Sequence, residues 1–577
     1  MFLPPGEKIV ETKKCRISDK EFVITDKDLE FYDVLSPVFD GKKCLIPSPT
    51  ISPIERQIRR MAWRNYDQFY KSTCSLTGQE IISTYRPGTP YKVANLESWW
   101  SDSWSPYEYN KKIDFSRPFF EQFRELDQMT LHMPLSVSKS ENSTFTNFSV
   151  NNRNCYLCTR VAECEYCYYS LLIVRCKNCM DCADVSDSEY LYECVRTIKS
   201  YRSFYCTDCE NCQECYFLKD CSGCKNCFGS CNLRNAQFVF NNKQLSESEY
   251  RKNLSGALQY LPNSEQIRSN FLHFCEQFPK KYITGFNNED VSGNFLFSNA
   301  HVTFGFESSE SEKIRYAYGT VHGRDCIDAS FGYFCEKSLE ICGIASGYGL
   351  LFSLNCLNDC HDLLYCKDCV TATSDCFGCI SLKKGKHCIL NTQYSQHEYE
   401  TLAVQLIDHM RSTGEWGEFF PTLDSPYAYN ESAANTHFPQ EKQAVIDRGY
   451  AWYEGPKQEL IAPSYDILPI AQYTESVVGH DRAQSHIDAL LAAKIQCSES
   501  QKIYQILPQE LSFYIENQLP IPTRHPIIRS GTRMKNTLPM ELYDRMCDEC
   551  HVPFWTAYSP ERPEKILCEE CYRRLVY

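Results

Sequence analysis

The stretch that decides the fold begins CYLCTRVAECEYCYYSLLIVRCKNCMDC at residues 155–182 and continues to Cys227. All fifteen cysteines from Cys155 to Cys227 lie on one three-residue count, whereas Cys231 falls out of step. Where this count lacks cysteine, it carries small or apolar residues such as Val161. A side chain that points inward at every third residue would produce such a pattern.

A longer period is superimposed on the first, because Cys158, Cys176, Cys194 and Cys212 are each eighteen residues apart. No helical apolar pattern accompanies it, and Asn, Asp, Gly and Lys interrupt the stretch. We therefore predict a mainly β fold in which the coils of a β-solenoid, with about 18 residues per coil, stack their cysteines into interior ladders. The spacing of three is not the usual hexapeptide pattern, so the cross-section stays open.

Two other interpretations of the cysteine repeats remain. The run Cys176-x2-Cys179-x2-Cys182 resembles the cluster-binding run of a ferredoxin, which would indicate an iron–sulfur or redox protein. Adjacent C-x-x-C pairs, as at Cys221, Cys224 and Cys227, could instead hold further zinc. Against the iron–sulfur interpretation, no cysteine precedes a proline, and the count continues through Val, Leu and Thr, which do not ligate iron.

A hairpin and a helix are expected at the end of each of two solenoids. Residues 237–245 read as a hairpin with Asn-Asn at its turn, and Ser246 with Glu249 forms a capping box for the helix that follows. An unbroken offset of 149 residues carries this pair onto Ser395 and Glu398. The second solenoid is therefore expected at about residues 285–390, with small insertions where its cysteine count slips.

The two ends of the chain resemble each other. At an offset of 482 residues Cys15 matches Cys497, and at an offset of 473 the sequence around Pro53 matches that around Pro526. We interpret this as a duplication that places a zinc-ribbon-like α+β module at each end of the chain.

The C-terminal module carries a strong metal-binding pattern, in which two C-x-x-C pairs flank a short β-like segment. Each pair places two thiolates on a tight turn, as tetrahedral zinc requires, so we predict one structural Zn²⁺ site. The predicted ligands are Cys547, Cys550, Cys568 and Cys571. The matching residues of the N-terminal module are Cys74, Thr77, Asn95 and Ser98, so that module is expected to keep the fold and to bind no metal.

Both modules carry a basic segment that could contact phosphate groups of a nucleic acid. The candidate residues are Arg56, Arg59, Arg60, Arg64, Arg524, Arg529, Arg533 and Lys535. The alternative is that the arginines bind carboxylates of their own module.

Five segments follow from these patterns: the N-terminal module with an aromatic capping segment (1–134), the first solenoid with its hairpin and helix (135–265), the second with its own (266–412), an aromatic connector and linker (413–495) and the C-terminal module (496–577). The capping segment contains Phe119, Phe120 and Phe123 at helical spacing after Pro118. We expect it to cover the open beginning of the first solenoid.

Composition narrows the class of protein. The chain has 577 residues, 35 cysteines and a net charge of −14, which argues against bulk electrostatic binding to nucleic acid or anionic membrane. No apolar run approaches the roughly 18 residues of a membrane span, and the N-terminus lacks the apolar region of a signal peptide. We expect a cytoplasmic protein with reduced or metal-bound thiols rather than a disulfide scaffold.

Several motifs carry a resemblance to a known family. Ala62-Trp63-Arg64-Asn65, Trp99-Trp100-Ser101-Asp102, Gly414-Glu415-Trp416-Gly417 and the final ribbon resemble an uncharacterised cysteine-repeat family of small-genome bacteria. The resemblance covers nearly the whole chain. Members are sometimes labelled CaiB/BaiF-like, which would imply CoA transfer, but no aspartate here lies in a recognisable CoA-binding context. The chain departs from the family's C-x-x-C pairs at Ser18, Thr77 and Ser500.

No motif predicts an enzyme: a phosphate loop, G-x-S-x-G, H-E-x-x-H and a dinucleotide fingerprint are all missing from the sequence. We therefore favour a non-catalytic cytoplasmic scaffold, a rigid solenoid that presents its terminal modules to a protein partner or to a second copy of itself. The alternatives are a nucleic-acid- or ribosome-binding protein that uses the basic segments, and an iron–sulfur or redox protein.

Overall fold

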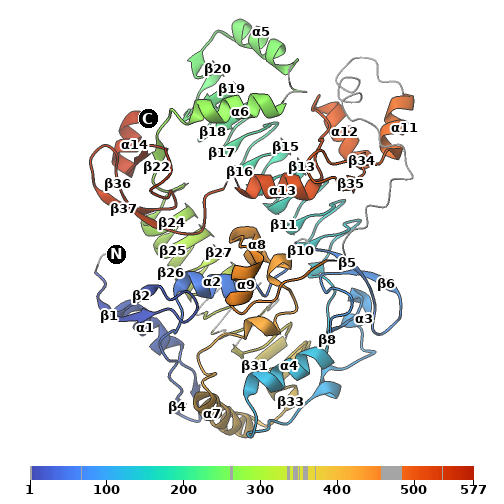
Figure 1. Cartoon of the computed structure of the whole chain (residues 1–577), viewed down its shortest axis with the longest axis vertical. Helices are drawn as coiled ribbons and strands as arrows, with labels where there is room; N and C mark the ends of the chain where they lie inside the picture. The colour runs from blue at the N-terminus through green and yellow to red at the C-terminus, as the bar shows by residue number, and fades with distance from the viewer. Residues whose placement is uncertain are drawn as a thin grey trace.

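The computed structural model describes residues 3–576 except 5, 67, 260, 262–263, 334–337, 342, 344–348, 350, 355–361, 371, 456–483 and 536. In these residues the fold is mainly β, as predicted, with two runs of stacked parallel strands and helices packed around them (Figure 1).

The first solenoid stacks its coils every twelve residues. Thr159 pairs with Leu171, and Leu171 with Ala183, in parallel register. The prediction of about 18 residues per coil is therefore wrong.

The strands of the first solenoid are β9 (Val137–Ser138), β10 (Asn147–Val150), β11 (Thr159–Ala162), β12 (Leu171–Val174), β13 (Lys177–Met180), β14 (Ala183–Ser186), β15 (Glu189–Tyr192), β16 (Val195–Ile198), β17 (Thr207–Glu210), β18 (Tyr216–Lys219), β19 (Lys225–Cys231), β20 (Gln237–Phe240) and β21 (Lys243–Gln244).

The backbone explains why the coil is shorter than expected. Every third residue has a positive φ, for example Asn178 (52°), Asp181 (57°) and Asp184 (55°). The chain turns at each of them, so a twelve-residue coil has four edges of three residues. Asn and Asp tolerate this left-handed conformation better than other residues with a Cβ atom. Eighteen residues thus span one and a half coils. Cysteines at this spacing therefore lie in ladders on opposite sides of the interior.

The cysteines of the three-residue count line the interior, as predicted. All fifteen are at most 3% exposed and form one apolar cluster with Val161, Ile173 and Leu218. Cys231, which is out of step, instead forms a disulfide with Cys275. The other cysteines in the described part of the chain are free thiols.

An aromatic ladder runs along the outside of the first solenoid. It includes Tyr192 and Phe204, and Phe217 lies in the row beside it; all three are at most 2% exposed. Two helices cover it: Phe271 of α6 (Ser264–Cys275) packs on Phe217, and Tyr514 of α12 (Pro508–Glu516) packs on Tyr192. Helix α12 belongs to the C-terminal module, so the far end of the chain completes the first solenoid.

The predicted ends of the solenoids are confirmed. Strands β20 and β21 form the hairpin, with positive φ at Asn241 and Asn242. Ser246 and Glu249 make the capping box of α5 (Glu247–Leu258), and Ser395 and Glu398 that of α7 (Gln396–Thr413).

The second solenoid repeats the twelve-residue stacking with local insertions. Ala300 pairs with Glu312, whereas Leu363 pairs with Cys376, thirteen residues on. Its strands are β22 (Lys280–Lys281), β23 (Gly285–Phe286), β24 (Glu289–Phe297), β25 (Ala300–Ser309), β26 (Glu312–Arg315), β27 (Tyr318–Val321), β28 (Arg324–Ile327), β29 (Ser330–Tyr333), β30 (Leu363–Leu364), β31 (Ala372–Phe377), β32 (Lys384–Ile389) and β33 (Thr392–Gln393).

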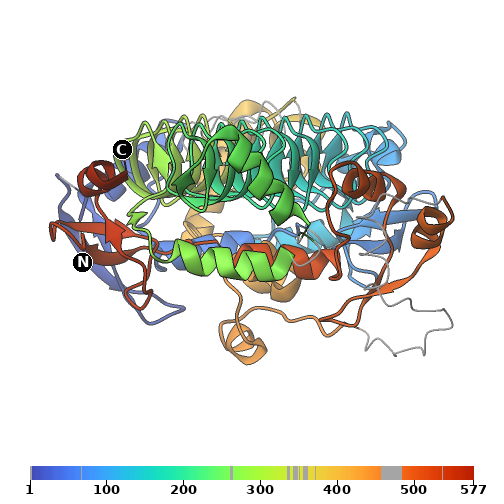
Figure 2. The same cartoon turned by 90° about the horizontal axis from the view of Figure 1, so that it is seen from above.

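The two solenoids lie side by side and run in opposite directions. Arg160 Nη1 lies 3.7 Å from Glu307, and Lys280 Nζ lies 2.7 Å from Asp220. As residue numbers rise in the first solenoid, those of the contacting residues fall in the second. Seen from above, the coils form one layer and the helices of the modules lie beneath it (Figure 2).

The terminal modules share their order of elements. The N-terminal module contains β1 (Ile9–Lys14), β2 (Glu21–Thr25), α1 (Asp26–Leu35), β3 (Val38–Phe39), β4 (Lys42–Lys43), α2 (Pro53–Met61), β5 (Tyr70–Thr73), β6 (Glu80–Ser83), β7 (Lys92–Val93), α3 (Leu96–Trp100) and β8 (Leu131–His132). The C-terminal module contains β34 (Ile495–Gln496), β35 (Ile503–Tyr504), α12, α13 (Pro526–Lys535), β36 (Tyr543–Met546), β37 (Pro553–Thr556), β38 (Ile566–Leu567) and α14 (Glu569–Val576). Helices α1 and α12 begin 482 residues apart, and α2 and α13 begin 473 apart, as the sequence offsets predict.

The aromatic capping segment lies elsewhere than expected. Its helix α4 (Phe119–Met129) places Phe119 against Tyr365 and Phe377, in the last coils of the second solenoid. The expectation that it covers the beginning of the first solenoid is therefore wrong. The connector holds α4 in place, because Glu415 accepts hydrogen bonds from the first two backbone N–H groups of the helix.

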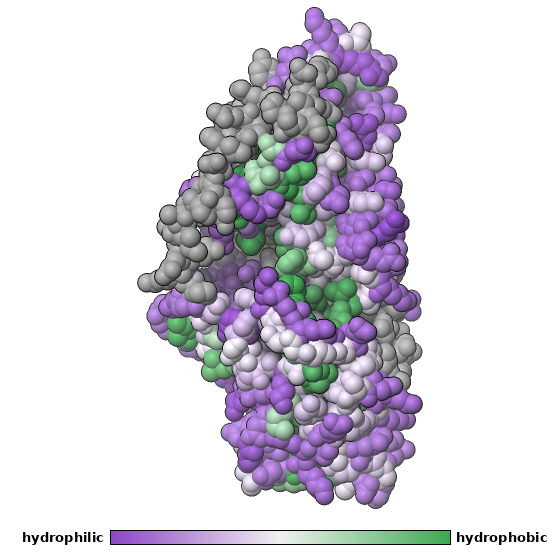
Figure 3. All heavy atoms as spheres, turned by 90° about the vertical axis from the view of Figure 1, so that its right-hand side faces the viewer, coloured by the Kyte–Doolittle hydropathy of each residue, from purple (hydrophilic) through white to green (hydrophobic). Residues whose placement is uncertain are grey.

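The connector contains η3 (Thr422–Asp424), η4 (Tyr429–Glu431), α8 (Ala433–His437) and α9 (Lys442–Asp447), and α11 (Gln484–Ala492) precedes the C-terminal module. Most of the predicted linker, residues 456–483, lies outside the described residues. The side seen in Figure 3 is hydrophilic over most of its length, with apolar side chains gathered near its middle.

Candidate metal centre

The first cysteine pair lies on a tight turn after β36. The N–H of Cys547 donates to the carbonyl oxygen of Val552 at 2.9 Å, and the N–H of His551 donates to that of Cys547 at 3.0 Å. His551 has φ of 59°, which reverses the chain and directs the thiol of Cys550 back towards that of Cys547.

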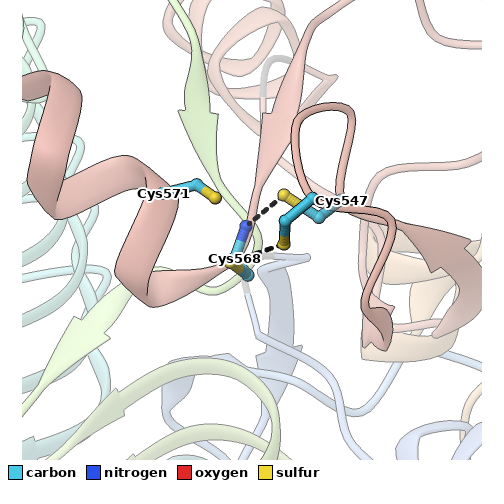
Figure 4. Close-up of side chains that lie close together, drawn as sticks. Cys547, Cys568 and Cys571 are labelled. Carbon is cyan, nitrogen blue, oxygen red and sulfur yellow. Dashed lines mark hydrogen bonds between the residues drawn. The ribbon is translucent and has the colours of Figure 1, made fainter.

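The second pair follows β38. Cys568 is the residue after this strand, and Cys571 lies in the first turn of α14. The N–H of Cys568 donates to Cys547 Sγ at 3.4 Å, which joins the two turns (Figure 4). A hairpin and a helix therefore supply two thiols each, as the sequence spacing predicts.

The four thiols converge. The Sγ atoms of the group Cys547, Cys550, Cys568 and Cys571 all lie within 4.8 Å of one another. A zinc ion bound at about 2.3 Å to four sulfurs separates them by roughly 3.8 Å, so this spacing fits a tetrahedral ion. Cys547 and Cys571 are buried, Cys568 is partly exposed and Cys550 is exposed.

The electrostatics of the site favour a bound cation. Burial raises the pKa of the Cys547 thiol, but backbone N–H groups of Cys550 and Cys568 outweigh it and lower that pKa to about 6. Burial and the three neighbouring thiols raise the pKa of Cys571 to about 12. The Cys547 thiol therefore loses its proton readily, whereas the neighbouring thiols oppose deprotonation of Cys571. A divalent cation bound between the sulfurs would remove this repulsion between thiolates.

The site lies beside the junction between the C-terminal module and the second solenoid. Strand β38 pairs in parallel with β22, with Lys280 opposite Ile566. Thr556 Oγ1 donates to the carbonyl oxygen of Tyr282 at 2.7 Å, and the ring of Tyr282 lies 5.1 Å from that of Phe554. The second cysteine pair thus follows directly on the strand that docks the module.

Three further turns have the geometry of the Cys547 turn. The N–H groups of Cys15, Cys74 and Cys497 each donate across their turn at 2.8 Å. In each case the residue four positions on has a positive φ: Asp19 (57°), Gly78 (73°) and Gln501 (60°). Each module therefore contains two ribbon-like turns.

For two of these three turns, the same hydrogen bond to sulfur identifies the position that would complete a metal site. Asn95 donates its N–H to Cys74 Sγ at 3.3 Å, and Ser52 donates to Cys15 Sγ at 3.4 Å. Thr77 and Asn95 therefore stand where Cys550 and Cys568 stand in the C-terminal ribbon. In the described part of the chain, the Cys547 group is the only set of three or more Cys, His, Asp or Glu residues close enough to share an ion. The sequence did not predict the role of Ser52, because no cysteine marks it.

The basic segment of the N-terminal module lies in the interior. Arg56 is 2% exposed and its Nε lies 2.9 Å from Asp328 of the second solenoid. Arg60 contacts the same carboxylate at 3.4 Å, and Arg59 lies 2.6 Å from Glu340. Burial alone lowers the pKa of Arg56, but Asp328 raises it overall, so the guanidinium stays charged.

The basic segment of the C-terminal module repeats the arrangement on the other solenoid. Arg529 and Arg533 both contact Asp181, with Arg533 Nη2 at 3.0 Å. The nearest carboxylates thus belong to the solenoids. The alternative of carboxylates from the same module holds in part, because Glu510 of α12 lies 3.7 Å from Arg529 and Glu499 lies 3.8 Å from Arg524. Buried arginines held in this way do not face the phosphates of a nucleic acid.

The remaining residues of these segments are placed as follows. Arg64 is 3% exposed, and its guanidinium lies 3.8 Å from the ring of Phe148. Arg524 is partly exposed and lies 2.9 Å from Glu265. The side chain of Lys535 lies outside the described part of the structure.

Comparisons with known proteins identify no relative. No protein-family model matches the chain, and neither does any curated protein. Every helix in the described part of the chain is too short or too polar to cross a lipid bilayer.

Proposed function

We propose that the protein is a non-catalytic scaffold whose C-terminal module is held on the solenoid by one structural zinc ion. The supporting observation is a set of four thiols that converge beside the strand pair β22–β38. Four protein ligands leave no position for water or substrate, so such an ion stabilises a fold rather than a reaction. Cys547, Cys550, Cys568 and Cys571 would hold it.

The scaffold would present its surfaces to a protein partner. A solenoid whose neighbouring coils are joined by parallel strand pairs and interior side-chain ladders is stiff, and its flanking modules extend the surface that a partner can contact. The many buried free thiols suit a reducing compartment, so we place the protein in the cytoplasm. Its resemblance to the bacterial cysteine-repeat family is part of this proposal. The burial of Arg56, Arg60, Arg529 and Arg533 makes us favour the scaffold over nucleic-acid binding.

The metal content of the purified full-length protein tests this proposal. We expect a colourless protein with about one zinc per chain by plasma mass spectrometry, and loss of that zinc in Cys568→Ser. Cys74→Ser is the matched control, because Cys74 occupies the same turn in the N-terminal module and should leave the zinc content unchanged. Iron with visible absorbance would support the redox alternative instead. Full zinc retention by Cys568→Ser would contradict the assigned ligands.

A further inference from the structure

A groove lies where the second solenoid begins. Its volume is about 1330 Å³, and it is bounded by α1, by the first coils of the second solenoid and by the C-terminal ribbon. The aromatic residues Phe31, Phe286 and Trp555 line it. Among the apolar residues that line it, Phe286 is 37% exposed and Val34 is 58% exposed.

The backbone of Gly285 and Asn287, at the edge of the solenoid, lines this groove. In the second coil, Leu296 and Ser298 donate their N–H groups to the carbonyl oxygens of the preceding coil at 3.2 and 2.9 Å. Strand pairing places Gly285 and Asn287 at the equivalent positions of the first coil. The described part of the chain provides no earlier coil for them. Lys281 Nζ donates to the carbonyl oxygen of Gly285 at 3.1 Å, so this acceptor is already used and the N–H groups of Gly285 and Asn287 are donors that a partner can meet.

The neighbouring part of the same edge already carries an added strand. The N–H groups of Lys280 and Tyr282 donate to the carbonyl oxygens of Lys565 and Leu567 at 2.8 and 2.9 Å. These contacts belong to the parallel pair of β22 with β38. The end of the solenoid therefore accepts a parallel strand, and the ribbon covers only its first residues.

The charge and size of the groove limit what it binds. Its basic residues are Lys27, Lys281, Lys313, Arg315 and Arg573, and its acidic residues are Glu7, Glu30, Asp290, Asp325 and Glu569. Five charges of each sign disfavour a polyanion such as nucleic acid. The volume exceeds the roughly 300–1,000 Å³ of small-molecule pockets. Alternating backbone donors are matched by the carbonyl groups of an extended chain.

We propose that this groove binds an extended peptide segment of a partner protein, which adds as a parallel strand to β23. The segment has little net charge and places an apolar side chain against Phe286 and Trp555. This inference rests on the proposed scaffold function and specifies the partner's chemistry. Main-chain hydrogen bonds supply the affinity, and the aromatic side chains supply the specificity.

A displayed library of random twelve-residue peptides, selected on the full-length zinc-loaded protein, tests the inference. We expect near-neutral peptides with micromolar Kd whose affinity falls at least tenfold in Phe286→Asp and in Trp555→Ala. Leu423→Asp is the control, because Leu423 is 68% exposed and does not line the groove. Three results would overturn the proposal. They are equal binding of the peptides to all three variants, selection of strongly charged peptides, and selection of no peptide at all.

Hydrogen exchange by mass spectrometry distinguishes strand addition from a contact of side chains alone. Bound peptide should slow exchange in the segment that contains Gly285 and Asn287, and binding without this protection would overturn the proposal. Analytical sedimentation tests whether a second copy of the chain occupies this edge instead. A dimer that Phe286→Asp abolishes would show this and would overturn the proposal of a partner peptide. Zinc content is measured on the same samples. Zinc without peptide binding refutes only this inference, whereas lack of zinc refutes the proposed function.

Discussion

Cysteine suits the interior ladders because its thiol is small and donates to backbone carbonyl oxygens. Cys158 Sγ lies 3.3 Å from the carbonyl oxygen of Tyr156 and 3.2 Å from that of Cys167. Burial raises the pKa of the Cys158 thiol well above its ordinary value, so the thiol keeps its proton. Small residues such as Ser203 replace cysteine in the ladders with the same hydrogen bonds. The interior thus needs no metal for its polar atoms to be paired.

One buried carboxyl group between the solenoids has an altered pKa. Burial and the nearby carboxylate of Asp184 raise the pKa of Glu307 to about 8, although Arg160 and Arg196 oppose the rise. An acid with a raised pKa in the folded state stabilises the fold while it is protonated. That contribution is complete below about 4.5, its ordinary pKa, and is lost as the pH rises through about 8.

We predict that Glu307→Gln removes this pH dependence. Between pH 5.5 and 8 the natural protein should lose stability with a slope of up to about 1.4 kcal/mol per pH unit from this group, and the variant should lack that slope. Thermal denaturation across the range measures it. Glu163→Gln, which removes an exposed carboxylate of the first solenoid, serves as the control. Equal slopes in the natural protein and Glu307→Gln would contradict the prediction.

At the scale of the element, the regular left-handed corners determine the coil. Each corner residue has a positive φ, as at Asn211 (50°) and Asn226 (50°), and the next residue points inward. The sequence predicted the inward positions and both capping boxes, because those patterns are local. It did not predict the length of the coil. The number of three-residue edges in one coil depends on the backbone angles, and the pattern of residue types does not specify those angles.

We predict that Asn226→Val destabilises the first solenoid by about 1–2 kcal/mol, because a β-branched side chain opposes the left-handed conformation. Asn226→Gly should leave stability unchanged or raise it, since glycine adopts that conformation freely. Urea denaturation followed by circular dichroism measures both. Lys225→Val, an exposed position one residue earlier in β19, is the matched control. Equal effects of valine at 225 and at 226 would show that the corner carries no strain.

At the scale of the whole molecule, the modules dock crosswise. The N-terminal module binds Asp328 of the second solenoid through α2, and the C-terminal module binds Asp181 of the first through α13. Both aspartates are corner residues with positive φ, at 60° and 57°. Each basic helix therefore binds the solenoid that lies farther from it in sequence. Strand β38 of the C-terminal module also pairs with β22 of the second solenoid, so the four parts form one interlocked body.

We predict that Asp181→Ala loosens the C-terminal module, because it removes the carboxylate shared by the buried Arg529 and Arg533 and leaves Arg529 only the more distant Glu510, at 3.7 Å. Removing one partner of a buried ion pair costs about 3–5 kcal/mol. Limited proteolysis should then cleave between the module and the solenoid sooner than in the natural protein. Asp187→Ala is the control, since Asp187 is also a corner residue but pairs with Arg175 at the surface, where the expected cost is about 0–1 kcal/mol. Identical cleavage rates for the two variants would contradict the crosswise clamp.

The four converging thiols were predictable because their pattern is local. Cys547 and Cys550 lie on one turn, Cys568 and Cys571 on another, and the short strand between the pairs brings the turns together. The partners of the arginines stayed open for the opposite reason. Their charge was compatible with phosphate contacts or with ion pairs, because Arg56 meets its partner Asp328 across 272 residues of chain.

By itself the sequence determined the inward ladder of thiols, the hairpin and capped helix that end each solenoid, and the four cysteines of the metal centre. Each depends on side chains close together along the chain and on a short repeating period. Only the tertiary structure decided that a coil has twelve residues, that α4 covers the second solenoid and that the modules dock crosswise. These features depend on backbone angles and on long-range contacts, which a pattern of residue types does not encode.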